Sequence, residues 1–185
     1  MPTQATLTTS RLVLRRFSPA DAPSLVGLLA DREIAANTLT IPHPYSRADA
    51  DTWLSTLQVK FDEGKHATFA ITLRRDGALV GCAGLNINPD HARAELGYWI
   101  GRDHRGRGVA TEACAAVIRH GIETLGLERI FASHYLRNPA SGRVLAKLGM
   151  SHEGVARRST RKWDRFEDTA VYAIVRGDPL PPAAR

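Results

Sequence analysis

A Gly-rich segment in the middle of the chain joins a strand-like run directly to a helix-like run, and it constrains the fold more than any other feature. The segment is Gly101-Arg-Asp-His-Arg-Gly-Arg-Gly-Val-Ala-Thr-Glu112. Glycine lets the backbone adopt positive φ and lets a ligand approach it closely. The first amides of a helix have no partner within the helix, and with the helix dipole they favour a phosphate group. The segment therefore predicts a pyrophosphate cradle, to which Arg102, Arg105 and Arg107 add positive charge.

Two common phosphate-binding loops do not fit this segment. A P-loop ends in Gly-Lys-Ser/Thr, whereas Gly108 is followed by Val-Ala. A Rossmann turn needs a third glycine where Thr111 stands, and an acidic residue that closes the next strand, whereas Glu128 precedes its strand. A dinucleotide site and a glycine-rich turn without function stay open as lesser alternatives.

The alternation of apolar and polar residues organises the rest of the chain. Strands are expected over residues 11–17, 67–73, 79–87, 94–100, 129–135, 153–157 and 168–175. Capping signals at Ser18 and Ser46 start two helices, and two more are expected over 109–125 and 139–148. Antiparallel strands followed by a β-α-β-α order predict one α+β domain around a mixed sheet. The domain should span 1–185, with a core of about 10–176 and a loose Pro-rich tail over 177–185.

Composition narrows the class of protein less than the loop does. The formal net charge of +6 fits nucleic acid, an acidic partner or a polyanionic cofactor. No apolar run is long enough to cross a bilayer and no secretory signal is visible, so a cytoplasmic location is expected. Cys82 and Cys114 should then be reduced core residues. The histidines lack metal-ligand spacing, so no metal is predicted.

The loop and a later segment together resemble the GNAT superfamily of acyl-CoA N-acyltransferases. Arg105-Gly-Arg-Gly-Val-Ala110 matches the family pattern Gln/Arg-x-x-Gly-x-Gly/Ala, and Asn138-Pro-Ala-Ser-Gly-Arg-Val-Leu-Ala-Lys-Leu-Gly-Met150 matches its Asn…Lys-Leu-Gly-Phe pattern with Met for Phe. The runs 12–17, 94–100 and 163–176 are similar to the RimJ/RimL-type branch. The resemblance covers residues from about 10 to 176.

The resemblance implies a fold, a co-substrate and a binding site. The fold would be a single mixed, mostly antiparallel sheet of seven strands flanked by about four helices, splayed between the fourth and fifth strands. Acetyl-CoA would lie in the splay, with its pyrophosphate on the loop amides. The implied cofactor-binding residues are Tyr98, Trp99, Ile100, Arg105, Gly106, Arg107, Gly108, Val109, Ala110, Thr111 and Asn138.

Two residues are expected to carry the acid–base chemistry. Many relatives place a tyrosine as proton donor four residues after the position of Ser141, where this chain has Leu145. The branch resemblance gives that role to Ser141 instead. Glu95 is the preferred base, because it lies on the strand that enters the splay while its neighbour Leu96 must face the other side of the sheet. Glu153 and His134 are alternative bases, whereas Glu112 is expected to serve only the helix dipole.

The predicted activity is transfer of the acetyl group to a primary amine, by direct attack in a ternary complex. The acceptor would be a protein N-terminus of the ribosomal-protein type or a small-molecule amine. It would be bounded by the two early helices, the loop 38–45 and the hairpin near Trp163. No membrane, metal or specific nucleic acid is expected as a partner, and a homodimer is allowed.

Two other classes of function stay open. The basic run Arg157-Arg-Ser-Thr-Arg-Lys-Trp-Asp-Arg165 is compatible with a nucleic-acid or ribosome-binding module. A non-catalytic acyl-CoA-binding protein is the other alternative.

Overall fold

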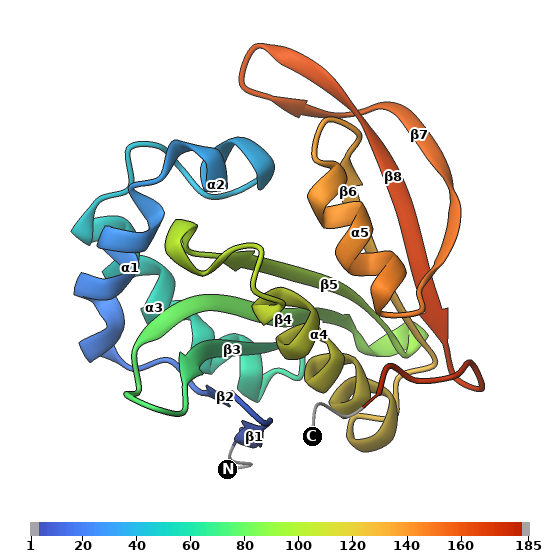
Figure 1. The fold of residues 1–185 in the computed structure, drawn as a ribbon, viewed down its shortest axis with the longest axis horizontal. Helices are drawn as coiled ribbons and strands as arrows, with labels where there is room; N and C mark the ends of the chain where they lie inside the picture. Colours follow the sequence, from blue (N-terminus) through green and yellow to red (C-terminus); the bar gives the residue numbers. More distant parts are fainter. Residues whose placement is uncertain (1–3, 183–185) are drawn as a thin grey trace.

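An eight-stranded mixed sheet with helices on both faces forms the frame of the computed structural model, which describes residues 4–182 (Figure 1). Its strands are β1 (Leu7–Thr8), β2 (Leu12–Arg15), β3 (His66–Leu73), β4 (Leu79–Asn88), β5 (Arg93–Ile100), β6 (Arg129–Tyr135), β7 (Ser151–Lys162) and β8 (Arg165–Val175). The strand order is β1-β2-β3-β4-β5-β6-β8-β7. Among the eight strands described, only β5 and β6 pair in parallel, so the α+β class and the mixed, mostly antiparallel sheet are confirmed.

Within residues 4–182, five α-helices lie between these strands. They are α1 (Ala22–Leu29), α2 (Arg32–Asn37), α3 (Arg47–Asp62), α4 (Val109–Arg119) and α5 (Pro139–Lys147), and a π-helical turn, His120–Thr124, extends α4. The start signals behave as expected, because the carboxylates of Asp21 and Asp49 accept the backbone N–H groups of Ser18 and Ser46, both at 2.8 Å. Such reciprocal caps satisfy amides that the helix itself leaves bare.

The predicted counts of seven strands and four helices were each one too low. The missed strand, β1, is only two residues long and pairs Leu7 with Leu14 of β2. The missed helix, α2, has six residues, which is too short for an amphipathic period to show. Its signal was Asp31, whose side chain accepts the N–H of Glu33.

The terminal hairpin is longer than expected because its outer half is polar. β7 and β8 run to Lys162 and from Arg165, although charged side chains there hide the apolar alternation on which a strand prediction rests.

The sheet opens between β5 and β6, as the resemblance implied. The two strands pair only at Arg93–Arg129, Ala94–Ile130 and Glu95–Phe131. Beyond Glu95, β5 continues to Ile100 along β4, while β6 continues to Tyr135 along β8. One backbone edge of each strand is therefore left facing the other across a splay.

Two cores lie on opposite faces of the sheet. One packs α4 and α5 against residues such as Leu96 and Ile130, and the other packs α1 and α3 around Phe17 and Cys82. Cys82 and Cys114 are free and buried, as predicted. Burial raises the pKa of the Cys82 thiol to about 12, so it is a poor nucleophile at neutral pH.

The segment expected to be a loose tail is partly docked. Leu180 packs against the core under α4, and Arg119 donates to the carbonyl of Pro181 at 3.4 Å. Residues 183–185 lie outside the described part of the chain.

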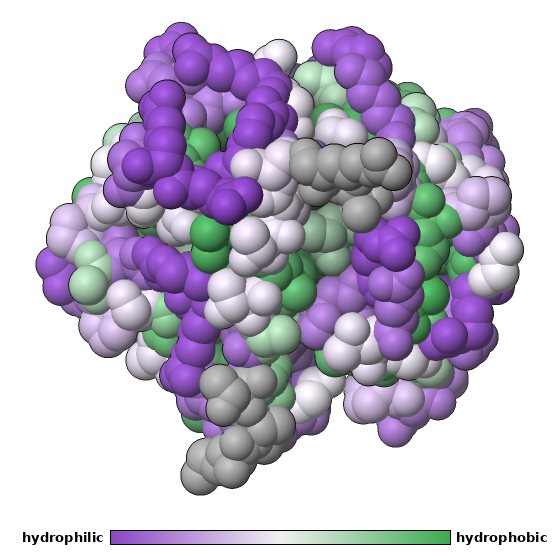
Figure 2. Space-filling model, turned by 60° about the horizontal axis from the view of Figure 1, so that its bottom comes forward, coloured by the Kyte–Doolittle hydropathy of each residue, from purple (hydrophilic) through white to green (hydrophobic). Residues whose placement is uncertain are grey.

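With the bottom of the molecule turned forward, hydrophilic side chains spread across this face and hydrophobic ones form separate patches (Figure 2). Within residues 4–182, no helix is long and apolar enough to cross a membrane.

Candidate functional site

The Gly-rich loop ends on a helix start whose amides are bare. Gly106 and Gly108 have φ values of 72° and 78°, in the left-handed region that glycine tolerates. Gly108 is the N-cap of α4 and has no side chain to cap it. The first amide of the helix with a backbone partner is that of Glu112, which donates to the carbonyl of Gly108 at 3.0 Å. The N–H groups of residues 109–111 are therefore available to an anion.

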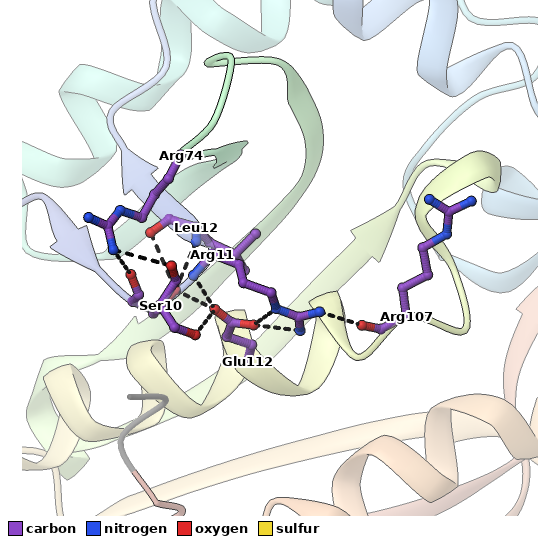
Figure 3. A network of polar contacts seen from close by, with 7 residues as sticks. Ser10, Arg11, Leu12, Arg74, Arg107 and Glu112 are labelled. Atoms are coloured by element: carbon purple, nitrogen blue, oxygen red, sulfur yellow. Dashed lines mark hydrogen bonds and ion pairs between the residues drawn. The ribbon is translucent and has the colours of Figure 1, made fainter.

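A polar network holds this helix start in place (Figure 3). The buried carboxylate of Glu112 accepts the Thr9 hydroxyl at 2.6 Å and both the N–H and the Nε–H of Arg11, at 3.0 and 2.6 Å. Arg11 also donates to the carbonyl of Arg107 at 2.9 Å. Burial alone would raise the pKa of Glu112, but the hydrogen bonds from Thr9 and Arg11 outweigh it and hold that pKa below its usual value of 4.5.

The hydrogen bonds from Thr9 and Arg11 to Glu112, which we call the Glu112 brace, were not predicted from the sequence. A structural role for Glu112 was predicted. Its partners lie about 100 residues away, in the turn between β1 and β2. The loop is thus fixed to the first strands of the sheet as well as to its own helix.

Replacing Glu112 with glutamine is expected to lower the free energy of unfolding by about 2–3 kcal/mol at pH 7, because charge-assisted hydrogen bonds in a buried site are lost. Chemical denaturation measures this. Since the folded-state pKa is lowered, the contribution is present at neutral pH and disappears as pH falls through that pKa. The difference between wild type and E112Q should shrink in acid.

The control for this variant is Glu123→Gln, which breaks an exposed i,i+4 pair with Arg119. It should change stability by less than about 0.5 kcal/mol. An E112Q protein as stable as E123Q would show that these contacts of Glu112 do not stabilise the fold, and a deficit that persists unchanged in acid would show that the charge of Glu112 is not what stabilises it.

Arg105, which was predicted to bind the cofactor, has its guanidinium engaged within the protein. Its guanidinium donates to the carbonyl of Ile100 at 2.9 Å and pairs with Asp31 and Glu33, both at 2.7 Å. Its charge is therefore neutralised, and it ties the loop to the start of α2. The carbonyl of Ile100, on a strand expected to face the cofactor, is engaged by the same contact.

Positive charge beside the loop comes from Arg74 and Arg107, for which no ion pair is found among residues 4–182, whereas Arg11 pairs with Glu112 and Arg75 with Asp76. The Arg107 side chain extends away from the brace (Figure 3). A hollow of about 520 Å³ next to it is lined by Ser10, Arg11, Leu12, Leu73, Arg74, Arg75, His104, Arg107 and Val109. Arg11 and Arg74 were not predicted as part of the site, because a strand start and a hairpin turn carry no signal that they meet the loop.

The start of α5 lies across the splay from β5. Asn138 is the N-cap of α5, and its Oδ1 accepts the N–H of Ser141 at 3.3 Å. That oxygen accepts this hydrogen bond, and the NH₂ of Asn138 is available to donate to a ligand. The Ser141 hydroxyl lies 2.6 Å from the Tyr98 hydroxyl of β5. Leu145 is fully buried in the core.

Glu95 lies where the splay begins. It is the last residue of β5 that pairs with β6, opposite Phe131, and it is half-buried. Leu96 points into the core under α4, so the two side chains lie on opposite faces of the sheet, as predicted. Burial raises the pKa of Glu95 above its usual value, which makes its carboxylate a stronger base.

The two alternative bases are placed less well. Glu153 forms an ion pair with Arg129, whose hydrogen bonds lower the pKa of that carboxyl. The Nδ1 of His134 lies 2.9 Å from the carbonyl of Tyr135. Its Nε2 is buried without a partner among the described residues, and a Cβ at Gly142 would meet it at 2.7 Å. His134 therefore lies beneath α5.

Two of the segments expected to bound the acceptor, the loop 38–45 and the hairpin near Trp163, are in contact, and the unpredicted helix α2 contacts the hairpin as well. The guanidinium of Arg137 pairs with Glu167 of β8 and donates to Asn37 of α2, both at 2.8 Å. The Arg32 guanidinium lies 4.6 Å from the ring centre of Trp163. The buried Lys162 donates to a carbonyl of the loop 38–45 at 3.2 Å. Part of the basic run is thus used in internal contacts.

No cluster of three or more His, Cys, Asp or Glu residues that could hold a metal ion occurs in the described ranges.

Known proteins match both the sequence and the fold. The acetyltransferase (GNAT) domain model matches residues 11–151. The chain is 32% identical to an uncharacterized N-acetyltransferase, YoaA of Bacillus subtilis (strain 168), over 171 residues, which are 92% of this chain and 96% of that protein. It is 27% identical to the ribosomal protein uS5-alanine N-acetyltransferase of Escherichia coli (strain K12), over 95% of this chain and 93% of that protein.

A solved structure shares the fold of this chain. Mycobacterium smegmatis RimJ in complex with CoA-disulfide superposes with a TM-score of 0.88 at 24% identity, over 98% of this chain and 91% of that one. This likeness concerns the fold, and the family rests on the sequence matches. The chain belongs to the GNAT family of acetyltransferases, the acetyl-CoA-dependent N-acyltransferases that its loop and its α5 segment resemble.

Proposed function

We propose that this enzyme acetylates the free α-amine of a protein or peptide, with acetyl-CoA as donor. The observation that carries the proposal is the splay itself. It opens beside the bare amides of α4 and has Ser141 and Glu95 at its borders. The uS5-alanine N-acetyltransferase among the relatives supports this class of acceptor. The cytoplasmic location expected from the sequence is part of the same proposal.

The residues present fit the co-substrate. The N–H groups of residues 109–111 suit a pyrophosphate, and the free backbone edge of β5 suits an extended chain with amide groups. Bound acetyl-CoA supplies the acetyl group as an activated thioester. Ser141 would stabilise the departing thiolate, Glu95 would take the amine proton through water, and the NH₂ of Asn138 would hold the donor chain.

The pKa of the acceptor amine favours an α-amine over a lysine side chain. With a parent pKa of roughly 7.7–8.0, between about one α-amine in six and one in eleven is neutral at pH 7, whereas a lysine near 10.4 is neutral about once in 2,500. A single carboxylate such as Glu95 can deprotonate the first kind without a second cationic or metal group to help it. Small-molecule amines of comparably low pKa remain the second candidate.

Thiol release from acetyl-CoA tests the proposal with a matched panel of acceptors. The panel contains a peptide with a free N-terminal Ala or Ser, the same peptide N-terminally blocked but with an internal Lys, a polyamine and an aminoglycoside. We expect kcat/KM for the free α-amine to exceed that for the blocked peptide by at least about 10-fold, because so little lysine is neutral.

Three results would contradict this function. Faster acetylation of the polyamine or aminoglycoside would assign a small-molecule acceptor. CoA binding without transfer to any acceptor would favour the non-catalytic alternative. RNA binding that falls steeply with salt, with no CoA binding, would favour the nucleic-acid alternative.

A further inference from the structure

We propose that Tyr98 is a positioning residue that acts through Ser141. Its phenol donates a hydrogen bond to the Ser141 oxygen and leaves the serine proton free to point at the cofactor sulfur. The inference rests on the proposed function, because it assigns a second group to the site that receives the departing thiolate.

The direction of donation follows from the surroundings of the two hydroxyls. Their oxygens are 2.6 Å apart, a distance at which either could donate. The phenol has a single proton, and of its two acceptors the Ser141 hydroxyl oxygen at 2.6 Å is much nearer than the Ser141 backbone carbonyl at 3.4 Å. A phenol is in addition the more acidic hydroxyl and the better donor. Among residues 4–182, the Ser141 hydroxyl has no other hydrogen-bond partner, so its proton is the one left over.

Both ends of this contact are held by rigid elements. The backbone of Tyr98 pairs with Ala83 in β4, and its half-buried ring packs against the core under α4. On the other side, the Asn138 cap fixes the start of α5. Gly142 lets α5 approach His134 more closely than any residue with a Cβ could. The Ser141 hydroxyl is therefore oriented before any ligand arrives.

The pKa values of the phenol and of the thiol decide whether Tyr98 donates a hydrogen bond or transfers a proton. Burial raises the pKa of Tyr98 above its usual value, so the phenol stays protonated at neutral pH. A thiol has a parent pKa of about 8.5, so a thiolate cannot remove the proton of this phenol. Tyr98 and Ser141 thus donate hydrogen bonds and transfer no proton.

The electron and proton balance of the reaction is complete without a proton from Tyr98. As the C–N bond forms and the C–S bond breaks, the sulfur keeps the electron pair as a thiolate, and the amine proton leaves by way of Glu95. A chain of two hydroxyls polarises the inner one, so Ser141 donates more strongly to the sulfur than it would alone. At the α5 position where many relatives have a tyrosine, this chain has Leu145, which is buried in the core. The phenol that contacts Ser141 is instead Tyr98, which lies on β5.

Ionisation of the CoA thiol bound to the enzyme tests this inference without any acetyl transfer. Thiolate absorbance is titrated with pH for wild type, Y98F, S141A and the double variant, each with saturating CoA. Hydrogen bonds to the thiolate lower the thiol pKa, so S141A should raise it by about one unit and Y98F by about half as much. Because Tyr98 acts through Ser141, Y98F should add nothing in the S141A background. In turnover, Y98F should lower kcat about 5- to 20-fold with KM for acetyl-CoA unchanged.

The matched control is Tyr172→Phe. Tyr172 is also half-buried, and its hydroxyl has no hydrogen-bond partner in the described part of the chain. It should leave thiol ionisation and kcat as in wild type.

Two outcomes would overturn the inference. Y98F could shift the thiol pKa equally with and without Ser141, or it could weaken CoA binding and leave thiol ionisation unchanged. Either result with normal acetylation by the wild type leaves the proposed function standing. A wild type that binds CoA but acetylates nothing overturns only the function, since the titration still reports on Tyr98. A wild type that does not bind CoA overturns both.

Discussion

Replacing Gly108 with valine is expected to weaken CoA binding at least about 100-fold, which corresponds to roughly 2.7 kcal/mol. At φ 78° a β-branched residue is strained. Its Cβ would also lie 3.3 Å from Nη2 of Arg11, a group that the Glu112 brace holds in place. The backbone must therefore leave this conformation, and the bare amides at the start of α4 leave with it. Isothermal titration with CoA measures the loss.

Gly64→Val is the matched control for this strain. Gly64 has a φ of 67° between α3 and β3, and a Cβ there would meet nothing within 4 Å. Both variants should keep the circular dichroism of wild type and lose a few degrees in Tm, because each pays about 1–3 kcal/mol of backbone strain. Only the variant at Gly108 should lose CoA. Binding by G108V within about threefold of wild type, less than 1 kcal/mol, would mean that these amides do not hold the pyrophosphate.

The sequence predicted an element of the fold wherever that element is long and has a clear local signal. The strands of the meander, the capped helices α1 and α3 and the helix after the Gly-rich loop were predicted because their periodicity or caps extend over enough residues. The elements β1 and α2 were missed because two and six residues do not make a period. The splay, in contrast, was inferred from the family resemblance, because the sequences of β5 and β6 contain no signal for the point at which their pairing ends.

The candidate site was predictable in its parts but not in its contacts. The glycines at 106 and 108 signalled their own backbone geometry, because positive φ is a local property. The neutralisation of Arg105 by Asp31 and Glu33 was not visible, because these residues are more than 70 positions apart. For the same reason Tyr98 was expected only to line the cofactor's strand. Its hydroxyl meets Ser141 because β5 and α5 converge in three dimensions.

Replacing Glu95 with glutamine is expected to lower kcat by about 10²- to 10⁴-fold, the contribution typical of a general base. The glutamine side chain has nearly the same shape, so acetyl-CoA binding should be unchanged. Because burial raises the pKa of Glu95, kcat/KM of the wild type should fall as pH drops through that raised pKa, in addition to the fall caused by protonation of the acceptor amine. In E95Q only the ionisation of the amine should remain. Steady-state rates across pH, with one peptide acceptor, measure both effects.

Stability separates this role from that of a merely structural carboxylate. A carboxyl whose pKa is raised on folding makes the folded state less stable as pH rises through the window between its unfolded and folded pKa values. At neutral pH, E95Q should therefore be at least as stable as wild type while being far less active, a trade expected of a functional residue. Glu153→Gln is the control. It breaks the partly exposed pair with Arg129. It should lower the free energy of unfolding by less than about 1 kcal/mol and leave the activity almost unchanged. If E153Q loses the activity and E95Q keeps it, the base is Glu153. If neither variant loses activity, His134 or water accepts the amine proton.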